Sequence, residues 1–125
     1  MNKARPRSKS PDPIESSLAS QMDAQAETAA ELLKAMASPQ RLRVLCLLLD
    51  GERSVGQINE QVDLSQSALS QHLAVLRESH LVNTRRQAQT VFYSVAPGPV
   101  DAIIRTLHGI YCKPSRAGTA RNKAH

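Results

Sequence analysis

The sequence predicts a small, mainly α-helical domain with one β-hairpin near its C-terminal end. Three observations support this fold class. Between residues 22 and 79 apolar residues recur at helical spacing, roughly every three to four positions. The spacing then shortens to about two in a pair of short segments rich in β-branched and aromatic residues, and a last helical pattern follows. With 125 residues and 2% aromatic residues, the chain has room for a single core of Leu, Val, Ile and Ala.

Two helices are expected in the N-terminal half. The first covers about residues 22–36, where alanines and leucines share one face. Ser38 and Pro39 then supply a side-chain cap and a first helical residue for a second helix. That helix runs to Asp50 and ends at Gly51. Because it is apolar nearly all round, we expect it at the centre of the fold.

Two shorter helices follow in close succession. Ser54 can cap a helix over about residues 55–62, and Asp63-Leu64 makes a short turn. Ser65 can cap the next helix, which runs with leucines on its inner face to about Ser79. Two short capped helices joined by so few residues form a helix-turn-helix.

The hairpin and a last helix complete the domain. The segments 81–86 and 90–95 have strand character and flank residues 87–89. Because this hairpin directly follows the second helix of the pair, it forms a wing. A final helix covers about Val100–Tyr111. The predicted architecture is a winged helix-turn-helix with four helices, two strands and a fifth helix.

The positive charge of the chain lies at its ends. The formal net charge is +5, but residues 14–112 carry 8 basic against 10 acidic residues. We expect disordered basic tails at residues 1–20 and 113–125 around a folded domain at residues 21–112. Net charge therefore does not identify a nucleic-acid partner. What matters is whether the basic residues within the fold gather on one face.

Several classes of protein are disfavoured by composition. No apolar run approaches the ~18 residues that a membrane span needs, and no secretory signal is recognisable. We therefore expect a cytoplasmic protein whose two cysteines do not form a structural disulfide framework. The chain has no nucleophile–base pair, glycine-rich phosphate loop or paired-carboxylate pattern, so we expect no enzyme and no cofactor.

The second helix of the pair has the side chains expected of a DNA-reading helix. Its outer face is uncharged and hydrogen-bonding, and glutamine and serine suit base edges in the major groove. Arginines follow in the helix and the wing, where they would contact phosphates. The alternative is an ordinary polar surface helix with capping serines. The predicted DNA-binding residues are Ser65, Gln66, Ser67, Ser70, Gln71, His72, Arg77, Arg85, Arg86, Gln89 and Thr90.

Three stretches together resemble the ArsR-type (arsenic-repressor) winged-helix family. They are MASPQRLRVLCLLLDGERSVGQI at residues 36–58, LSQSALSQHLAVLRESHLV at residues 64–82 and RRQAQTVFYSV at residues 85–95. The resemblance implies a homodimer that pairs through its first and last helices and represses transcription by occupying double-stranded operator DNA. Two-fold pairing would then place the half-sites about one helical turn, ~34 Å, apart.

Metal sensing, which many members of that family perform, is poorly supported. One type of site needs paired cysteines near the start of the third helix, where this chain has residues 54–57, Ser-Val-Gly-Gln. The other type uses carboxylates and histidines of the last helix; Asp101 and His108 are present, but Ile103 stands where a histidine would be expected. Two ligands rarely hold zinc, so we predict no metal site.

The two cysteines suggest a different signal. A buried cysteine such as Cys46 is commonly just a small apolar residue. The positions of Cys46 and Cys112, however, resemble those in the sulfide-responsive branch of the family, the persulfide-sensing and biofilm-growth-associated repressors. In that branch one cysteine of the second helix faces one of the last helix. The resemblance implies redox sensing by this pair. Because Cys112 lies at a helix end beside Lys113, we expect it to react first and Cys46 to resolve the product.

The sequence thus predicts a repressor whose operator affinity is switched when a persulfide or oxidant links Cys46 and Cys112, derepressing genes of sulfide detoxification. Alternatives are an antirepressor or activator of virulence genes with the same fold, a metal-sensing repressor, and a winged helix that binds protein instead of DNA. A dithiol oxidoreductase is disfavoured because the cysteines do not form an exposed CxxC pair.

Overall fold

The structure is a computed structural model that describes residues 13–112. The chain forms two compact units, one ending at Lys34 and one beginning at Ala35. In the described part of the first unit there is a single helix, α1 (Pro13–Met36). Its residues up to Lys34 belong to this unit. None of the helices within residues 13–112 is both long and apolar enough to cross a membrane.

Helix α1 begins earlier than the sequence pattern indicated. The predicted start was about residue 22, whereas the helix starts at Pro13 and includes part of the segment expected to be a disordered tail. An amphipathic pattern arises where one face of a helix is buried, and residues 18–21 are all exposed. The turns before Met22 therefore gave no periodic signal. The other residues assigned to tails, 1–12 and 113–125, lie outside the described part of the chain.

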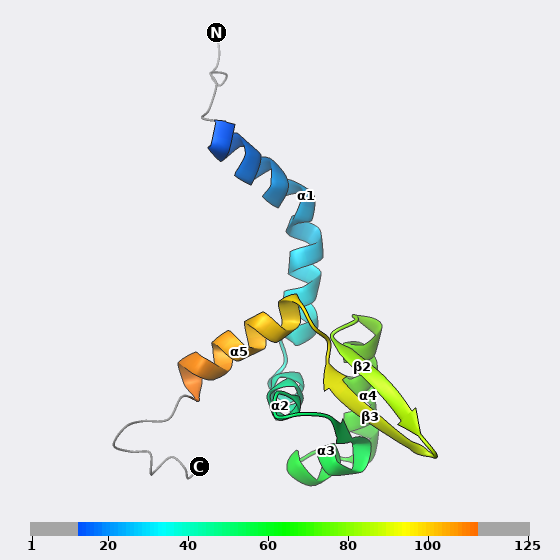
Figure 1. The fold of residues 1–125 in the computed structure, drawn as a ribbon. Helices are drawn as coiled ribbons and strands as arrows, with labels where there is room; N and C mark the ends of the chain where they lie inside the picture. The colour runs from blue at the N-terminus through cyan, green and yellow to red at the C-terminus, as the bar shows by residue number, and fades with distance from the viewer. Residues whose placement is uncertain (1–12, 113–125) are drawn as a thin grey trace, which may run out of the picture. The chain divides into compact units, whose positions relative to one another are not determined.

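The second unit is a winged helix-turn-helix, as predicted (Figure 1). Its sheet is antiparallel with three strands in the order β1–β3–β2, so β2 and β3 form the expected hairpin and β1 adds a third strand. Strand β1 was not predicted from the sequence, because two residues are too few to show an alternation of apolar and polar side chains. The elements are α2 (Pro39–Leu48), β1 (Arg53–Ser54), α3 (Val55–Gln61), α4 (Gln66–Glu78), β2 (Val82–Gln87), β3 (Thr90–Val95) and α5 (Pro99–Tyr111).

Helix α2 lies at the centre of this unit, as its composition predicted. It packs against α4, α5 and β3. Its Val44 and Leu45 are completely buried, and they contribute to the same core as Ile58 of α3, Leu69 of α4 and Ile104 of α5. One apolar helix surrounded by amphipathic neighbours therefore sets the relative positions of the DNA-reading helix and the last helix.

Local capping signals position the helix ends. The Ser38 hydroxyl accepts a hydrogen bond from the Arg41 amide, and Pro39 begins α2, as predicted. Helix α2 ends at Leu48, slightly before the predicted end, and the chain turns through Gly51 at a φ of 135°. At the end of α4, the Leu81 amide donates to the Leu76 carbonyl in a Schellman motif.

Candidate functional site

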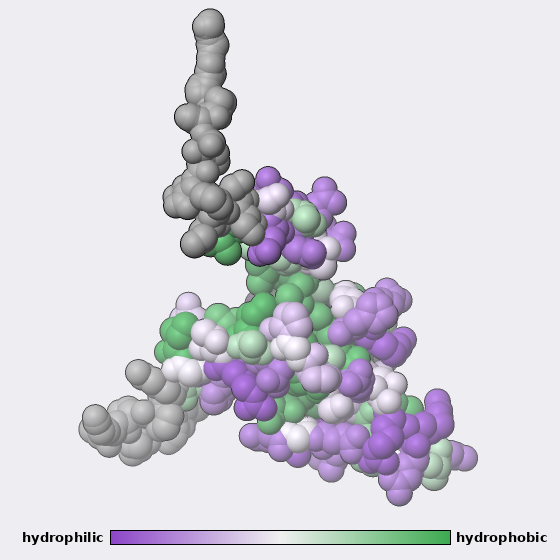
Figure 2. Space-filling view, turned by 45° about the horizontal axis from the view of Figure 1, so that its top comes forward, coloured by the Kyte–Doolittle hydropathy of each residue, from purple (hydrophilic) through white to green (hydrophobic). Residues whose placement is uncertain are grey.

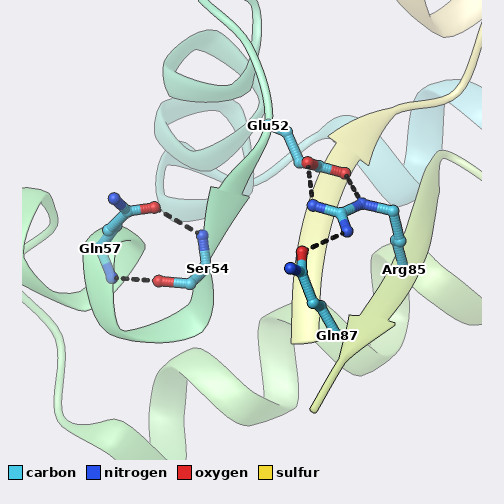
Figure 3. Close-up of polar contacts among 5 residues, drawn as sticks. All are labelled: Glu52, Ser54, Gln57, Arg85 and Gln87. Carbon is cyan, nitrogen blue, oxygen red and sulfur yellow. Dashed lines mark hydrogen bonds and ion pairs between the residues drawn. The ribbon is translucent and has the colours of Figure 1, made fainter. Parts of the chain in front are cut away.

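The helix-turn-helix is held together by hydrogen bonds at each of its turns. The Ser54 hydroxyl accepts from the Gln57 amide at 3.1 Å, and the Gln57 side chain accepts from the Ser54 amide at 2.8 Å, which completes a capping box at the start of α3 (Figure 3). The Asn59 side chain donates to the Leu64 carbonyl at 2.9 Å across the turn. Ser65 caps α4 through the Ala68 amide at 3.1 Å. These contacts fix the angle at which α4 leaves α3.

The outer face of α4 has the composition and exposure of a DNA-reading surface. Leu69, Leu73 and Leu76 are buried, so the opposite side of the helix faces solvent. In the part of the chain that the structure describes, the side chains of Gln66, Ser70 and Gln71 make no internal hydrogen bond and are available to a ligand. The exposed residues predicted to contact DNA on this face are Ser65, Gln66, Ser67, Ser70 and Gln71.

His72 does not belong to that face. Its side chain is half-buried, and Nδ1 lies 3.3 Å from an Nη1 of Arg41 in α2. A guanidinium can only donate, so Nδ1 accepts in this contact. Arg41 also donates from Nε to the Ala35 carbonyl at 2.6 Å. His72 therefore helps to seat α4 on α2, and the sequence-based assignment of His72 to DNA is not supported by its position.

The exposed tip of the wing is polar. Hydrophilic side chains cover the end of the unit where the hairpin projects (Figure 2). Gln89 and Thr90, both predicted DNA contacts, lie exposed at the tip, where Ala88 adopts a φ of 58°. Arg77 of α4 donates to the Tyr93 hydroxyl of β3 at 3.1 Å and so links the reading helix to the wing.

The adjacent arginines of β2 point to opposite faces of the sheet. Arg86 pairs in register with Val91, and Thr84 with Tyr93, whose side chain is buried and reaches Arg77 of α4. Because directly paired residues share a face and successive residues alternate, Arg86 lies on the face that packs against α4. Within residues 18–112 its side chain has no hydrogen-bond or ion-pair partner.

Arg85 lies on the other face, where each of its guanidinium nitrogens donates a hydrogen bond (Figure 3). Nε and Nη2 donate to the two Glu52 oxygens at 2.9 and 2.7 Å, and Nη1 donates to the Gln87 side chain at 2.8 Å. The guanidinium carbon also lies 4.6 Å from the centre of the Phe92 ring. The hydrogen bonds from Arg85 hold the pKa of the Glu52 carboxyl below its ordinary value. Arg85, a predicted DNA contact, is therefore exposed on the face opposite to Arg86 and is paired with Glu52.

Cys46 of α2 and Cys112 at the end of α5 are brought together, although they are far apart in sequence. Both line an apolar groove of about 440 Å³ between the two helices, whose other lining residues are Leu42, Ile104, Leu107, His108 and Tyr111. Both also line a second groove of about 460 Å³, which Arg43 and Gln61 border. Cys46 is half-buried, while Cys112 is exposed. In the sequence, only the family resemblance indicated that these two cysteines face each other, since their spacing along the chain does not give their distance in space.

The environment of Cys46 makes its thiol the less reactive one. Burial raises the pKa of Cys46, and the neighbouring Cys112 raises it further, because a second thiolate there would be repelled. Only the thiolate is nucleophilic. The exposed Cys112 is therefore better placed to meet a reagent from solution.

Alkylation should reveal this difference. With iodoacetamide, we expect the half-maximal rate at Cys46 to require a higher pH than a cysteine in an unstructured peptide, since burial disfavours the thiolate. In the Cys112→Ser variant, this pH should fall somewhat, because the repulsion from Cys112 is lost. Mass spectrometry of peptides after timed labelling measures both sites. Labelling of Cys46 at or below the pH of the peptide would contradict the burial argument.

The last helix does not assemble a metal site. Asp101 is paired with Arg105, whose Nε lies 3.1 Å from a carboxylate oxygen. Among the residues described, no group of three His, Cys, Asp or Glu side chains is placed to hold a metal ion. His108 instead borders the groove of the cysteines.

The model of the family described as "Bacterial regulatory protein, arsR family" matches residues 38–84. The transcriptional activator HlyU of Vibrio cholerae is 52% identical over 96 residues, which are 77% of this chain and 89% of that protein. This chain belongs to the arsR family. Its family members are DNA-binding transcriptional regulators, so the chain is a regulator and not an enzyme.

Other relatives of this arsR-family regulator agree in sequence and in structure. The biofilm growth-associated repressor of Agrobacterium fabrum is 43% identical over 74% of this chain and 80% of its own length. The structure of reduced HlyU from Vibrio cholerae has a TM-score of 0.70 at 54% identity, over 74% of this chain and 97% of that one. The structure of the repressor BigR of Xylella fastidiosa has a TM-score of 0.69 at 39% identity. The match covers 74% of this chain and 95% of that one. Regulators of this family bind operator DNA and typically act as dimers.

Proposed function

We propose that this arsR-family regulator is a dimeric repressor that releases its operator when Cys46 and Cys112 become covalently linked. The observation that carries the proposal is the shared groove between α2 and α5, which both thiols line. The genes it would control are those that detoxify sulfide, because the linkage responds to reactive sulfur.

The DNA contacts of the proposal come from α4 and the wing. Gln66 and Gln71 would contact base edges in the major groove, with Ser67 and Ser70 beside them. The start of α4, capped by Ser65, directs backbone N–H groups toward a phosphate. In the wing, Gln89 and Thr90 at the tip and Arg86 on the α4 side would contact the backbone or the minor groove. Arg77 supports this surface through Tyr93.

A salt titration tests the wing contact. Arg86→Gln should weaken binding to every DNA sequence and should lower the slope of log K against log salt by about 0.9 for each protomer, because one phosphate contact is lost. Fluorescence anisotropy with the promoter region of the regulated gene measures both quantities. Arg105→Gln on α5 is the matched control and should change neither. A slope for Arg86→Gln equal to that of the unmodified protein would contradict the phosphate contact.

The thiol chemistry requires a persulfide, RSSH. The Cys112 thiolate attacks the terminal sulfur of RSSH, the S–S bond of the reagent breaks, and RSH leaves. Cys46 then attacks Cys112 Sγ, which forms the Cys46–Cys112 disulfide and releases H₂S. Overall the two thiols lose two electrons, and the transferred sulfur atom is reduced. If a second persulfide first converts Cys46 to its persulfide, the bridge retains one extra sulfur atom and again releases H₂S.

A bridge would act on DNA binding through α2. This helix carries Cys46 and packs against both α4 and α5. Disulfide formation requires Cα atoms within about 7 Å, so each type of bridge imposes its own separation on α2 and α5. Closely packed helices do not deform smoothly. The imposed separation would therefore move the last helix relative to the reading helix, and in a dimer it would alter the spacing of the two reading helices.

Dimerisation has suitable surfaces on each of the proposed helices. Helix α1 exposes Leu18, Met22 and Leu33, and α5 exposes Ile110 and Tyr111. Large apolar side chains exposed in clusters mark interaction surfaces. A second copy of the chain that covered them would pair two α4 helices for half-sites ~34 Å apart.

A second candidate, transcriptional activation, is favoured by one relative. The protein that is 52% identical over 77% of this chain is named an activator. Transcription in vitro from a template with the bound operator distinguishes the two candidates. A repressor lowers transcript yield when reduced and restores it after persulfide treatment, whereas an activator or antirepressor shows the opposite change.

A further inference from the structure

The contact between Glu52 and Arg85 has a specific position in the wing. Glu52 directly precedes β1, Arg85 is in the outer strand β2, and Phe92 lies between them in the middle strand β3. We infer that Glu52 and Arg85 are positioning residues, which hold the wing at the angle at which Arg86 meets DNA, and that Arg85 itself does not bind DNA. This inference rests on the proposed role of the wing.

Each nitrogen of the Arg85 guanidinium donates one hydrogen bond within the wing and its base. Two nitrogens hold the two oxygens of Glu52, and the third holds Gln87. Such paired, coplanar hydrogen bonds fix orientation as well as distance. The Phe92 ring under the guanidinium adds a cation–π contact on the same face. Arg85 also lies on the face of the sheet opposite to α4, away from the surface proposed to contact DNA.

The wing is joined to α4 through Tyr93, but its pairing with the rest of the sheet is short. Strand β1 pairs with β3 through Arg53 and Ser54 alone, and β2 pairs only with β3. A hairpin held in this way can twist about its long axis, which would move the exposed tip. The contact ties β2 across Phe92 to the segment before β1, and so restrains this twist. The pair is solvent-exposed, so its effect on folding is small, but a small change of angle at its base displaces the whole tip.

The decisive variant replaces both charges at once. In Glu52→Gln/Arg85→Gln the pair remains neutral overall, so a loss of affinity at an unchanged salt slope comes from geometry. We expect operator affinity to fall about threefold to tenfold, since each protomer of a dimer loses one exposed pair. The salt slope should stay at its original value, because no phosphate contact is lost. The reversed pair, Glu52→Arg/Arg85→Glu, should restore most of the affinity, although residue 85 is then acidic.

Three outcomes would overturn the inference. A drop in slope of about 0.9 per protomer in the neutral double variant would show that Arg85 binds phosphate. A gain in affinity for Glu52→Gln alone would show that Glu52 withholds an arginine from DNA. Failure of the reversed pair to recover affinity, in a variant whose melting temperature is unchanged, would show that the contact does not position the wing.

Two controls separate this inference from the function on which it rests. Asp50→Asn removes the looser ion pair of the same loop, Arg53 to Asp50 at 3.9 Å, and should leave operator affinity unchanged. Arg86→Gln tests whether the wing binds DNA at all. If Arg86→Gln weakens binding but the neutral double variant does not, only the positioning role fails. If neither variant weakens binding, the wing does not bind DNA, and the DNA contact proposed for it fails as well.

Discussion

Cys46→Ser and Cys112→Ser should each bind operator as tightly as the reduced protein and should no longer release it on treatment with a persulfide. The unmodified protein should lose affinity by about 5- to 150-fold, the usual range for coupling between two sites. The physical reason is that one thiol cannot form the bridge that sets the separation of α2 and α5. The two variants differ in chemistry, because Cys112 alone can still accept sulfur, whereas the half-buried Cys46 reacts slowly.

Fluorescence anisotropy with operator DNA, before and after treatment, measures the response, and intact-mass analysis of the same samples identifies the linkage. The control is Arg105→Gln, which keeps both thiols and changes a residue of α5 that does not line the groove. It should respond as the unmodified protein does. Full loss of affinity in the Cys46→Ser variant would contradict the bridge mechanism, and so would loss of affinity in the unmodified protein without any Cys46–Cys112 linkage.

Gln66→Ala and Gln71→Ala should remove most of the discrimination between operator and unrelated DNA. A bidentate contact from glutamine to adenine contributes about 1–3 kcal/mol of discrimination, and a dimer loses it twice. Each variant should therefore reduce the ratio of specific to non-specific affinity by at least about tenfold. Binding to unrelated DNA and the salt slope should stay unchanged, because phosphate contacts are retained.

Competition between operator and unrelated DNA of the same length measures that ratio. Gln61→Ala is a suitable control, because Gln61 is an exposed glutamine at the end of α3 that borders the groove of Cys46 instead of the outer face of α4. If the ratio for Gln71→Ala and Gln66→Ala equals that for Gln61→Ala, α4 does not read bases through these residues. The same measurement on Arg86→Gln should show weaker binding without a change in the ratio.

The amino-acid sequence alone determined the elements whose signals are local. The caps Ser38, Ser54 and Ser65 act on amide groups three residues away, so the starts of α2, α3 and α4 were predictable from neighbouring residues. The hairpin was predictable for the same reason, as was the uncharged outer face of α4 between buried leucines. Hydrophobic periodicity did not predict the first turns of α1, which are exposed, or β1, which has only two residues.

Only the tertiary structure decided what distant partners do to individual side chains. Arg85 and Arg86 are neighbours of the same type, yet their strand sends them to opposite faces, and Glu52, 33 positions away, engages one of them. Arg41 likewise contacts His72 across 31 positions and holds it half-buried between α2 and α4. The meeting of Cys46 and Cys112 depends on the packing of α5 on α2. Such pairings arise from how the elements pack in three dimensions, and local residue patterns do not encode them.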